Sequence, residues 1–261
     1  MAFPNIDPVI FNLGPLQVRW YGLMYVLAFI STYVLVRYQI RKFRLKKLES
    51  HFENLNFVLI ICLVLGARLG YVFFYNFGYY WEHPLEIAAT WQGGMSFHGG
   101  LLGMVIGAIW FCRKKGLDFL ETADIYCVTF PIGLGLGRLG NFINGELFGR
   151  VSDVPWAMVF PDGGPAARHP SQLYEFLLEG VVLFVILWTV KNRRPPGGVM
   201  LGYCWVFYGL FRCFVEFFRQ PDASLGLLFG FITMGQVLSS FMILAGLFLF
   251  LIRNRKKSGY S

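Results

Sequence analysis

Seven apolar segments dominate the sequence, and each is close to the length that a helix needs to cross a lipid bilayer. A spanning helix requires about 20 mostly apolar residues. Hydrophobic residues make up 56% of the chain and charged residues 15%, against about 45–50% and 25% in soluble proteins. We therefore predict an all-α integral membrane protein with seven transmembrane helices, forming a single polytopic domain over residues 1–261. The segments are approximately 20–36, 55–76, 95–112, 122–137, 173–190, 199–218 and 226–252.

The distribution of Lys and Arg predicts the orientation of these spans. Sixteen of the 23 basic residues follow segments one, three, five and seven, and basic residues concentrate in cytoplasmic loops. The N-terminus is therefore expected outside and the C-terminus in the cytoplasm. Residues 138–172, between spans four and five, are expected to form a small external cap. The net charge of +8 does not predict nucleic-acid binding, because the basic residues border long apolar runs.

The seven remaining basic residues are all arginine, whereas every lysine lies on the predicted cytoplasmic side. Arginine presents a planar fork that binds phosphate or carboxylate through two hydrogen bonds. The outer half of the protein is thus predicted to hold oxyanions; the alternative is that these arginines serve buried ion pairs. They are Arg19, Arg68, Arg138, Arg150, Arg168, Arg212 and Arg219.

Counting along the predicted helices places unusual polar residues at one level. With a rise of about 1.5 Å per residue, Arg68 and Arg212 fall in the outer half of the bilayer, and Glu179 lies roughly 10 Å below the outer surface. A charge near the bilayer centre costs about 2.5–3.5 kcal/mol on insertion scales. Several charges at one depth therefore predict a shared pocket.

Segment six carries a polar stripe on an otherwise apolar helix. Tyr208, Arg212, Glu216 and Arg219 fall within about 80° of one another on a helical wheel. Glu216 can pair with Arg212 at i+4 or with Arg219 at i+3. Two interpretations follow: the stripe is an internal ladder of ion pairs, or one arginine is available for a ligand.

Residues 137–149 read Gly-Arg-Leu-Gly-Asn-Phe-Ile-Asn-Gly-Glu-Leu-Phe-Gly. Glycine permits positive φ and close approach of the backbone, and successive exposed N–H groups form anion-binding nests. Arg138, Asn141 and Asn144 would add side-chain donors. The alternative is a glycine-rich helix break at the membrane surface, but this does not account for the density of polar residues.

Two histidine-containing segments border the predicted spans. His98 is followed by Gly99 and Gly100 at the outer end of segment three, and histidine titrates near neutrality, which suits general acid–base catalysis. The segment His169–Glu175 begins span five. Ser171 is predicted to cap that helix, so we interpret this stretch as mainly architectural. No cluster with metal-ligand spacing is found, and no metal or cofactor is predicted.

These motifs resemble one family, the bacterial prolipoprotein diacylglyceryl transferases. The signature Gly-Arg-x-Gly-Asn-Phe-x-Asn-x-Glu-x-x-Gly matches residues 137–149 at every fixed position. Residues 20–25, 95–100, 169–175 and 215–222 resemble the family's other blocks. The similarity therefore covers nearly the whole chain, although the stretch from Phe160 to Arg168 is shorter than in some members.

The resemblance implies transfer of the diacylglyceryl group of phosphatidylglycerol to the lipobox cysteine of a prolipoprotein. A thioether forms and glycerol 1-phosphate is released, at the outer face of the bacterial cytoplasmic (inner) membrane. The family analogy implies that Arg138 binds the lipid phosphate. Other positions that the family treats as important are occupied by His98, Tyr21, Asn141, Glu146, Gly149, Tyr208 and Arg212.

The predicted site therefore has two groups of residues. The catalytic candidates are His98, Arg138, Arg212, Tyr208 and Tyr21. The substrate-binding candidates are Arg138, Asn141, Asn144, Glu146, Gly149, Arg68, Glu216 and Arg219. The expected partners are phosphatidylglycerol, a prolipoprotein signal peptide and membrane lipids, with no nucleic acid. The alternative function is a transporter or channel for an anionic solute, but the polar residues are predicted only in the outer half, whereas a transport path crosses both leaflets.

Overall fold

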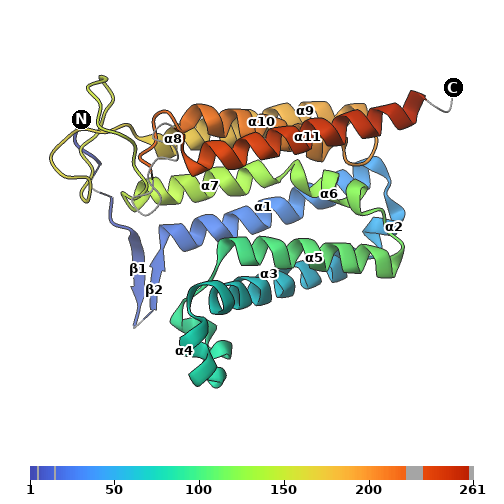
Figure 1. Ribbon diagram of the computed structural model, residues 1–261, viewed down its shortest axis with the longest axis horizontal. Helices are drawn as coiled ribbons and strands as arrows, with labels where there is room; N and C mark the ends of the chain where they lie inside the picture. Colours follow the sequence, from blue (N-terminus) through green and yellow to red (C-terminus); the bar gives the residue numbers. More distant parts are fainter. Residues whose placement is uncertain (5, 15, 222–231, 259–261) are drawn as a thin grey trace. The chain divides into compact units, whose positions relative to one another are not determined.

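A computed structural model describes residues 1–4, 6–14, 16–221 and 232–258, and most of these lie in helices (Figure 1). A short antiparallel pair, β1 (Val9–Leu13) and β2 (Leu16–Arg19), precedes the first helix. The longer helices are α1 (Trp20–Phe43), α3 (Phe52–Tyr75), α5 (Phe97–Lys115), α7 (Phe130–Ile143), α10 (Val199–Val215) and α11 (Met234–Ser258). The shorter ones are α2 (Lys46–Glu49), α4 (Phe77–Glu82), η1 (Pro84–Ala88), η2 (Thr90–Gln92), α6 (Phe119–Cys127), α8 (Ser171–Glu175), η3 (Phe176–Val182), α9 (Leu183–Val190) and η4 (Lys191–Arg193).

Four helices in the described ranges are long and apolar enough to cross a membrane, and a fifth span results if α6 and α7, bent by 41°, count as one. The four are Trp20–Phe43, Phe52–Tyr75, Ser171–Arg193 and Met234–Arg253. Helix α10 is apolar but shorter, and the glycines and basic end of α5 lower its mean hydropathy. A helical, multi-pass membrane protein is therefore supported. Seven spans and their direction stay a prediction, and the first residues of the predicted segment 226–252 lie outside the described ranges.

Many large apolar side chains lie on the helix surfaces. Phe74 on α3 and Phe241 and Phe248 on α11 are among the most exposed. Soluble monomers rarely expose apolar patches larger than a few hundred Å². In a bilayer the same side chains contact lipid tails, which explains why the helices leave them uncovered.

The described residues divide into two compact units, one drawn from Met1–Gln39 and Ala123–Ser261 and the other from Ile40–Thr122. In the second unit, α3 and α5 run antiparallel and pack through glycines (Figure 1). A Cβ atom on Gly70 would lie 2.7 Å from the Cα of Gly99, and one on Gly66 would lie 2.8 Å from the Cα of Gly103. Small residues at i and i+4 let membrane helices approach closely, so these glycines hold α3 against the first turns of α5.

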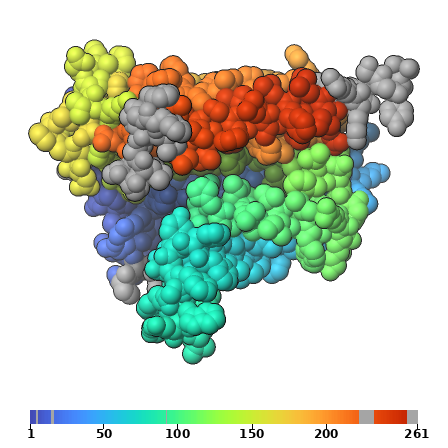
Figure 2. Space-filling view, viewed as in Figure 1, coloured from blue at the N-terminus to red at the C-terminus, as the bar shows by residue number. Residues whose placement is uncertain are grey.

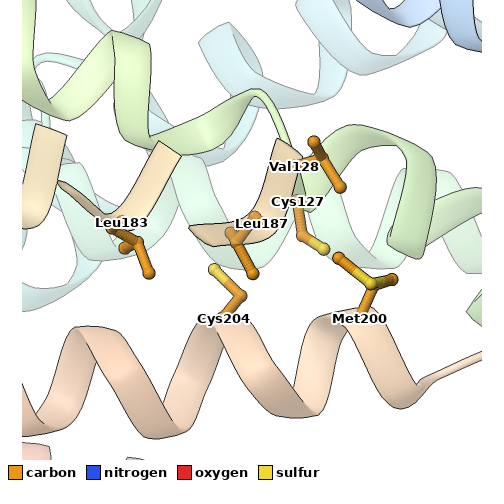
Figure 3. Close-up of a cluster of buried hydrophobic side chains, with 6 residues drawn as sticks. All are labelled: Cys127, Val128, Leu183, Leu187, Met200 and Cys204. Carbon is orange, nitrogen blue, oxygen red and sulfur yellow. The ribbon is translucent and has the colours of Figure 1, made fainter. Parts of the chain in front are cut away.

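The first unit contains β1, β2, most of α1 and the end of α6. It also contains α7, the continuous stretch α8–η3–α9, α10 and α11, which pack on one another. A cluster of buried side chains lies between α6, α9 and α10 (Figure 3). Beside it, Asp124 accepts hydrogen bonds from the backbone N–H groups of Gly198 and Leu201, both at 2.8 Å. This carboxylate satisfies free donors at the first turn of α10 and fixes where that helix begins.

Two expectations about local structure were wrong. Helix α7 continues to Ile143, so the first half of the motif at 137–149 is helical and only residues 144–149 form a turn. At Gly140 the helix packs closely on α1, because a Cβ atom there would lie 2.8 Å from the Tyr21 ring. Ser171 is not the cap of span five, because Pro170 holds that position and the Ser171 hydroxyl donates to the carbonyl of Leu147 at 3.1 Å.

Candidate active site

Six charged side chains meet in the first unit, and we call them the charge cluster. Arg138 comes from α7, Glu175 from the end of α8, Glu179 from η3 and Arg212 from α10, with Glu216 and Arg219 directly after α10. The side chains of the three carboxylates are at most 1% exposed. Three arginines thus face three glutamates, and the cluster is neutral when all six are ionised.

Glu175 joins two arginines from different helices. Its Oε2 lies 2.7 Å from Nε of Arg138, and its Oε1 accepts a hydrogen bond from Nη1 of Arg212 at 2.5 Å. Nε of Arg219 lies 3.7 Å from the same Oε1. Charge-assisted contacts of this length are among the strong ones in proteins. The guanidinium groups of α7 and α10 therefore converge on a single anion.

Glu216 binds two arginines, as its spacing predicted. Its Oε1 lies 2.5 Å from Nη2 of Arg212 and 3.5 Å from Nη1 of Arg219. Both the i+4 and the i+3 pair therefore form. Arg212 uses one terminal nitrogen on Glu175 and the other on Glu216, which fixes the plane of its guanidinium.

Glu179 is the least well partnered carboxylate of the cluster. It is fully buried, its nearest ion-pair contact is Arg212 Nη1 at 3.7 Å, and neither oxygen has a hydrogen bond within the described residues. Tyr208 lies within electrostatic range of Glu179, Arg138 and Arg212. The segment that carries Glu179, η3, is a π-helix, a distortion that occurs frequently at functional sites.

The turn after α7 is tied together by Glu146. Its Oε1 accepts hydrogen bonds from the amides of Asn141 at 2.9 Å and Asn144 at 3.1 Å, and its carbonyl accepts one from Gln172 at 2.6 Å. The hydroxyl of Tyr21, on α1, shares a hydrogen bond of 3.1 Å with the hydroxyl of Tyr25. The two asparagines thus direct a donor at a protein carboxylate, and their role toward a substrate stays a prediction.

Gly149 lies where three backbone segments meet. Its N–H donates to the carbonyl of His169 at 2.8 Å, and a Cβ atom on it would lie 2.8 Å from the His169 Cβ and closer still to the carbonyl oxygen of Phe218. Any side chain there would separate the turn from the end of α10. The motif therefore needs glycine at this position for close approach, whether or not it also contacts a substrate.

His169 belongs to an aromatic group beside the cluster. Its Nδ1 shares a hydrogen bond of 3.0 Å with the hydroxyl of Tyr174, which also accepts one from Nε1 of Trp156 at 2.6 Å. Burial lowers the pKa of His169 below its ordinary 6.5, which favours the neutral ring. Tyr174 immediately precedes Glu175 in the sequence, so this aromatic group supports the start of span five.

Four of the seven outer arginines bind protein oxygens away from the cluster; they are Arg68, described below, and Arg19, Arg150 and Arg168. Nη2 of Arg19 donates to Gln17 and Nε of Arg150 donates to the carbonyl of Arg219. Arg168 donates to the carbonyls of Gly163 and Gly149 and to the side chain of Gln220. Arg150 and Arg168 thereby connect the cap to the residues after α10, whereas Arg19 binds a neighbour within β2. The prediction that outer arginines hold a substrate oxyanion therefore rests on the arginines of the charge cluster.

The predicted residues His98 and Arg68 lie in the second unit. His98 is exposed in the first turn of α5, where Ser96 caps the helix by accepting a hydrogen bond from the N–H of Gly99 at 3.2 Å. Arg68 is buried on α3 and donates hydrogen bonds to four backbone carbonyls. The predicted site residues thus fall into two groups, one in each unit.

Comparison with known proteins decides the family. A model of the prolipoprotein diacylglyceryl transferase family matches residues 8–252. A phosphatidylglycerol–prolipoprotein diacylglyceryl transferase of Desulfotalea psychrophila is 56% identical, over 98% of this chain and 96% of that protein. Proteins of the same name from Geobacter sulfurreducens and Bordetella avium are 54% and 53% identical, over 99% of this chain and 100% and 98% of theirs. The chain belongs to the prolipoprotein diacylglyceryl transferase family.

Membership of the transferase family confirms the resemblance seen in the motifs. The relatives named above are all transferases, so the alternative of a transporter has no support. The family match spans α1 to α11, which means that both units of this transferase belong to the shared architecture.

The sequence motifs did not reveal that Glu175 is the centre of the cluster. The motifs place Glu175 in an architectural helix start and indicate Glu179 only as an acid at unusual depth. A signal was present, because Glu175 and Glu179 stand four residues apart in a long apolar segment, where two buried acids require cationic partners. The arginines that supply the charge come from other helices, so the pairing itself was not visible.

Gly235, in the first turn of α11, is a further residue that the motifs missed. A Cβ atom there would lie 2.5 Å from Oε1 of Glu216 and 2.7 Å from its Cδ. Thr233 and Gln236 fix this turn by reciprocal hydrogen bonds of 3.0 and 3.1 Å, an arrangement typical of a capping box. The first turn of α11 therefore packs directly against the Glu216 carboxylate.

Proposed function

We propose that this chain transfers the diacylglyceryl group of phosphatidylglycerol to the lipobox cysteine of prolipoproteins. The family and the names of the relatives support the reaction. The site is proposed to face the outer leaflet of the bacterial inner membrane, in a bundle of seven spans with the N-terminus outside and the C-terminus in the cytoplasm. The asymmetry of Lys and Arg between loops supports this orientation.

The observation that carries the proposal is the convergence of Arg138 and Arg212 on one buried carboxylate. Nε of Arg138 and Nη1 of Arg212 lie 2.7 and 2.5 Å from the two oxygens of Glu175. Two guanidinium groups at this separation are preorganised for an anion with paired oxygens. A phosphodiester has such oxygens, so the lipid phosphate is proposed to bind beside Glu175, at the terminal nitrogens of Arg138.

The proposed reaction is a displacement at a glycerol carbon. The cysteine sulfur forms a bond to that carbon while the carbon–oxygen bond to the phosphate breaks, and the bonding electron pair leaves with the phosphate oxygen. The thiol proton passes to a base, for which we propose His98, and glycerol 1-phosphate departs with one additional negative charge. Preorganised donors aimed at charge that develops in the transition state are usually the largest catalytic contribution, and Arg138 and Arg212 would supply it.

The test is a transfer assay with purified protein in lipid nanodiscs. The substrates are phosphatidylglycerol and a synthetic peptide with a lipobox cysteine, and mass spectrometry should find the peptide heavier by one thioether-linked diacylglyceryl group. The same peptide with serine at that position and nanodiscs of phosphatidylethanolamine alone should give no product. His98→Gln should lower the rate by at least about a hundredfold, the lower end of the range for a general base. No mass gain with the unchanged protein would refute the function, and normal turnover by His98→Gln would exclude His98 as the base.

Gly235→Ala should raise the KM for phosphatidylglycerol or lower kcat by about tenfold to a hundredfold, because a shift of about 1 Å in a positioning group can cost that much. The added methyl would displace Glu216 and with it Arg212 and Arg219. The matched control is Gly246→Ala, where a Cβ atom would lie 2.8 Å from the Gly202 carbonyl oxygen and so disturbs α10–α11 packing away from the cluster. If both variants lose activity in proportion to their loss of thermal stability, Gly235 acts through packing alone.

A further inference from the structure

Arg68 is enclosed by backbone carbonyls. It is 4% exposed, and its guanidinium donates to the carbonyls of Glu86 at 2.7 Å, Ile87 at 2.8 Å, Gly93 at 2.7 Å and Gly94 at 3.1 Å. The ring of Tyr80 lies 5.0 Å from its Cζ. Within the described ranges Arg68 has no ion pair, so carbonyl dipoles and one aromatic face surround its charge.

These four carbonyls belong to the segment that joins α3 to α5. The segment comprises α4, η1 and η2, and it stands out from the end of α3 and α5 as the lower, teal part of the surface in Figure 2. Gly93 and Gly94, which follow η2, both have positive φ, at 88° and 72°. A Cβ atom on Gly94 would lie 2.8 Å from Nη1 of Arg68, so this turn packs too closely on the arginine to admit a side chain.

The same turn leads directly to His98. Two residues after Gly94, the N–H of Ser96 donates to the carbonyl of Ala67 at 2.9 Å, and the hydroxyl of Ser96 accepts from the N–H of Gly99 at 3.2 Å. Residues 93–99 are thereby fastened to one turn of α3, at Ala67 and Arg68. We call this fastened stretch the strap; it leaves the His98 side chain exposed at its end.

We propose that Arg68 is a positioning residue for His98, acting through the strap, and not a ligand of the lipid phosphate. Hydrogen bonds in several directions require the planar fork of arginine, which lysine cannot reproduce. This inference rests on the proposed function, in which His98 takes the thiol proton. It replaces the expectation from sequence that Arg68 binds substrate.

A double-mutant cycle separates the two roles of Arg68. In the transfer assay, Arg68→Lys should lower kcat by about tenfold or more with the KM for phosphatidylglycerol changed by less than about twofold, because a residue that acts only on the chemical step leaves binding intact. In a His98→Gln background the same change should cost less than about twofold, because coupled residues are non-additive. A tenfold rise in KM, or a full additive loss in the His98→Gln background, would overturn the proposal.

Two further variants distinguish a specific effect on His98 from a general loss of folding. Ser96→Ala removes a smaller part of the strap and should show the same pattern with a smaller effect. Glu86→Gln is the matched control, because Arg68 binds the backbone carbonyl of Glu86 while its carboxylate accepts from Tyr79 at 2.7 Å. It should leave kcat unchanged, and a loss equal to that of Arg68→Lys would show that charge, not the strap, matters.

Hydrogen exchange tests the strap without any activity. In Arg68→Lys, the amides of Ser96 and Gly99 should exchange at least about tenfold faster while those in the middle of α3 stay protected, because local opening is independent of global unfolding. Unchanged protection at these amides would overturn the proposal. If the unchanged protein transfers no lipid but the strap loosens as expected, the proposed function fails and the structural role of Arg68 stands.

Discussion

Arg138→Lys should lower diacylglyceryl transfer by at least about a hundredfold, the cost of removing one preorganised donor from a dry site, although it keeps the positive charge. Nε of Arg138 contacts Glu175 at 2.7 Å. The two terminal nitrogens of Arg138, Nη1 and Nη2, make no hydrogen bond or ion pair within the described residues. They are therefore proposed to receive the lipid phosphate while Nε stays on the carboxylate. A lysine ammonium has a single nitrogen and cannot serve both.

The measurement is kcat and KM for phosphatidylglycerol in nanodiscs, with Arg138→Ala expected to abolish transfer. The matched control is Arg150→Lys, because Arg150 is exposed and its Nε donates to the carbonyl of Arg219 and not to a carboxylate. It should retain transfer within about threefold, as expected for an exposed substitution of about 0.5 kcal/mol. Full activity of Arg138→Lys would contradict the argument that this arginine binds two partners at once.

Glu175→Gln should destabilise the protein by about 3–5 kcal/mol, because removing one partner of a buried ion pair leaves uncompensated charge. Here it leaves Arg138 and Arg212 without the carboxylate that joins them. If the lipid phosphate binds Arg138 beside this carboxylate, phosphatidylglycerol supplies an anion in its place. The variant should therefore regain more thermal stability from phosphatidylglycerol than the unchanged protein does, with a gain of about 2.7 kcal/mol at a hundredfold excess over Kd.

Thermal unfolding in detergent, with phosphatidylglycerol or phosphatidylcholine added, measures this difference. Glu179→Gln is the control, because Glu179 is equally buried but contacts Arg212 only at 3.7 Å and does not join it to Arg138. Its stability should respond to phosphatidylglycerol as the unchanged protein does. If Glu175→Gln also shows no extra response, the phosphate binds elsewhere and the convergence of the two arginines is purely structural.

The helices of the fold were largely predictable because each spanning helix is a long apolar run with its own hydrogen bonds. Their ends were less so. Helix α7 continues to Ile143 through glycines that would break an isolated helix, because Tyr21 and Gly180 press against it. Helix α10 begins at Val199 where Asp124 satisfies its free N–H groups. Both boundaries depend on residues far away in the sequence.

The candidate site was predictable to a different degree at different residues. The stripe of Arg212, Glu216 and Arg219 was visible because helical periodicity alone brings i+3 and i+4 neighbours together, and both pairs form. Glu175 was misjudged because its partners come from α7 and α10. Gly235 was missed because its importance depends on a contact with Glu216 across two helices.

Length, hydropathy and motif spacing are properties of the chain alone, so they were enough to indicate the family, a helical membrane protein and the kinds of side chain available for the chemistry. Which arginine meets which oxygen depends instead on how the helices pack. Arg138 and Arg212 share one carboxylate, whereas Arg68 donates its hydrogen bonds to backbone carbonyls. An arginine fork can donate hydrogen bonds to a carboxylate, a carbonyl or a phosphate, so its role follows from which of these the fold places within reach.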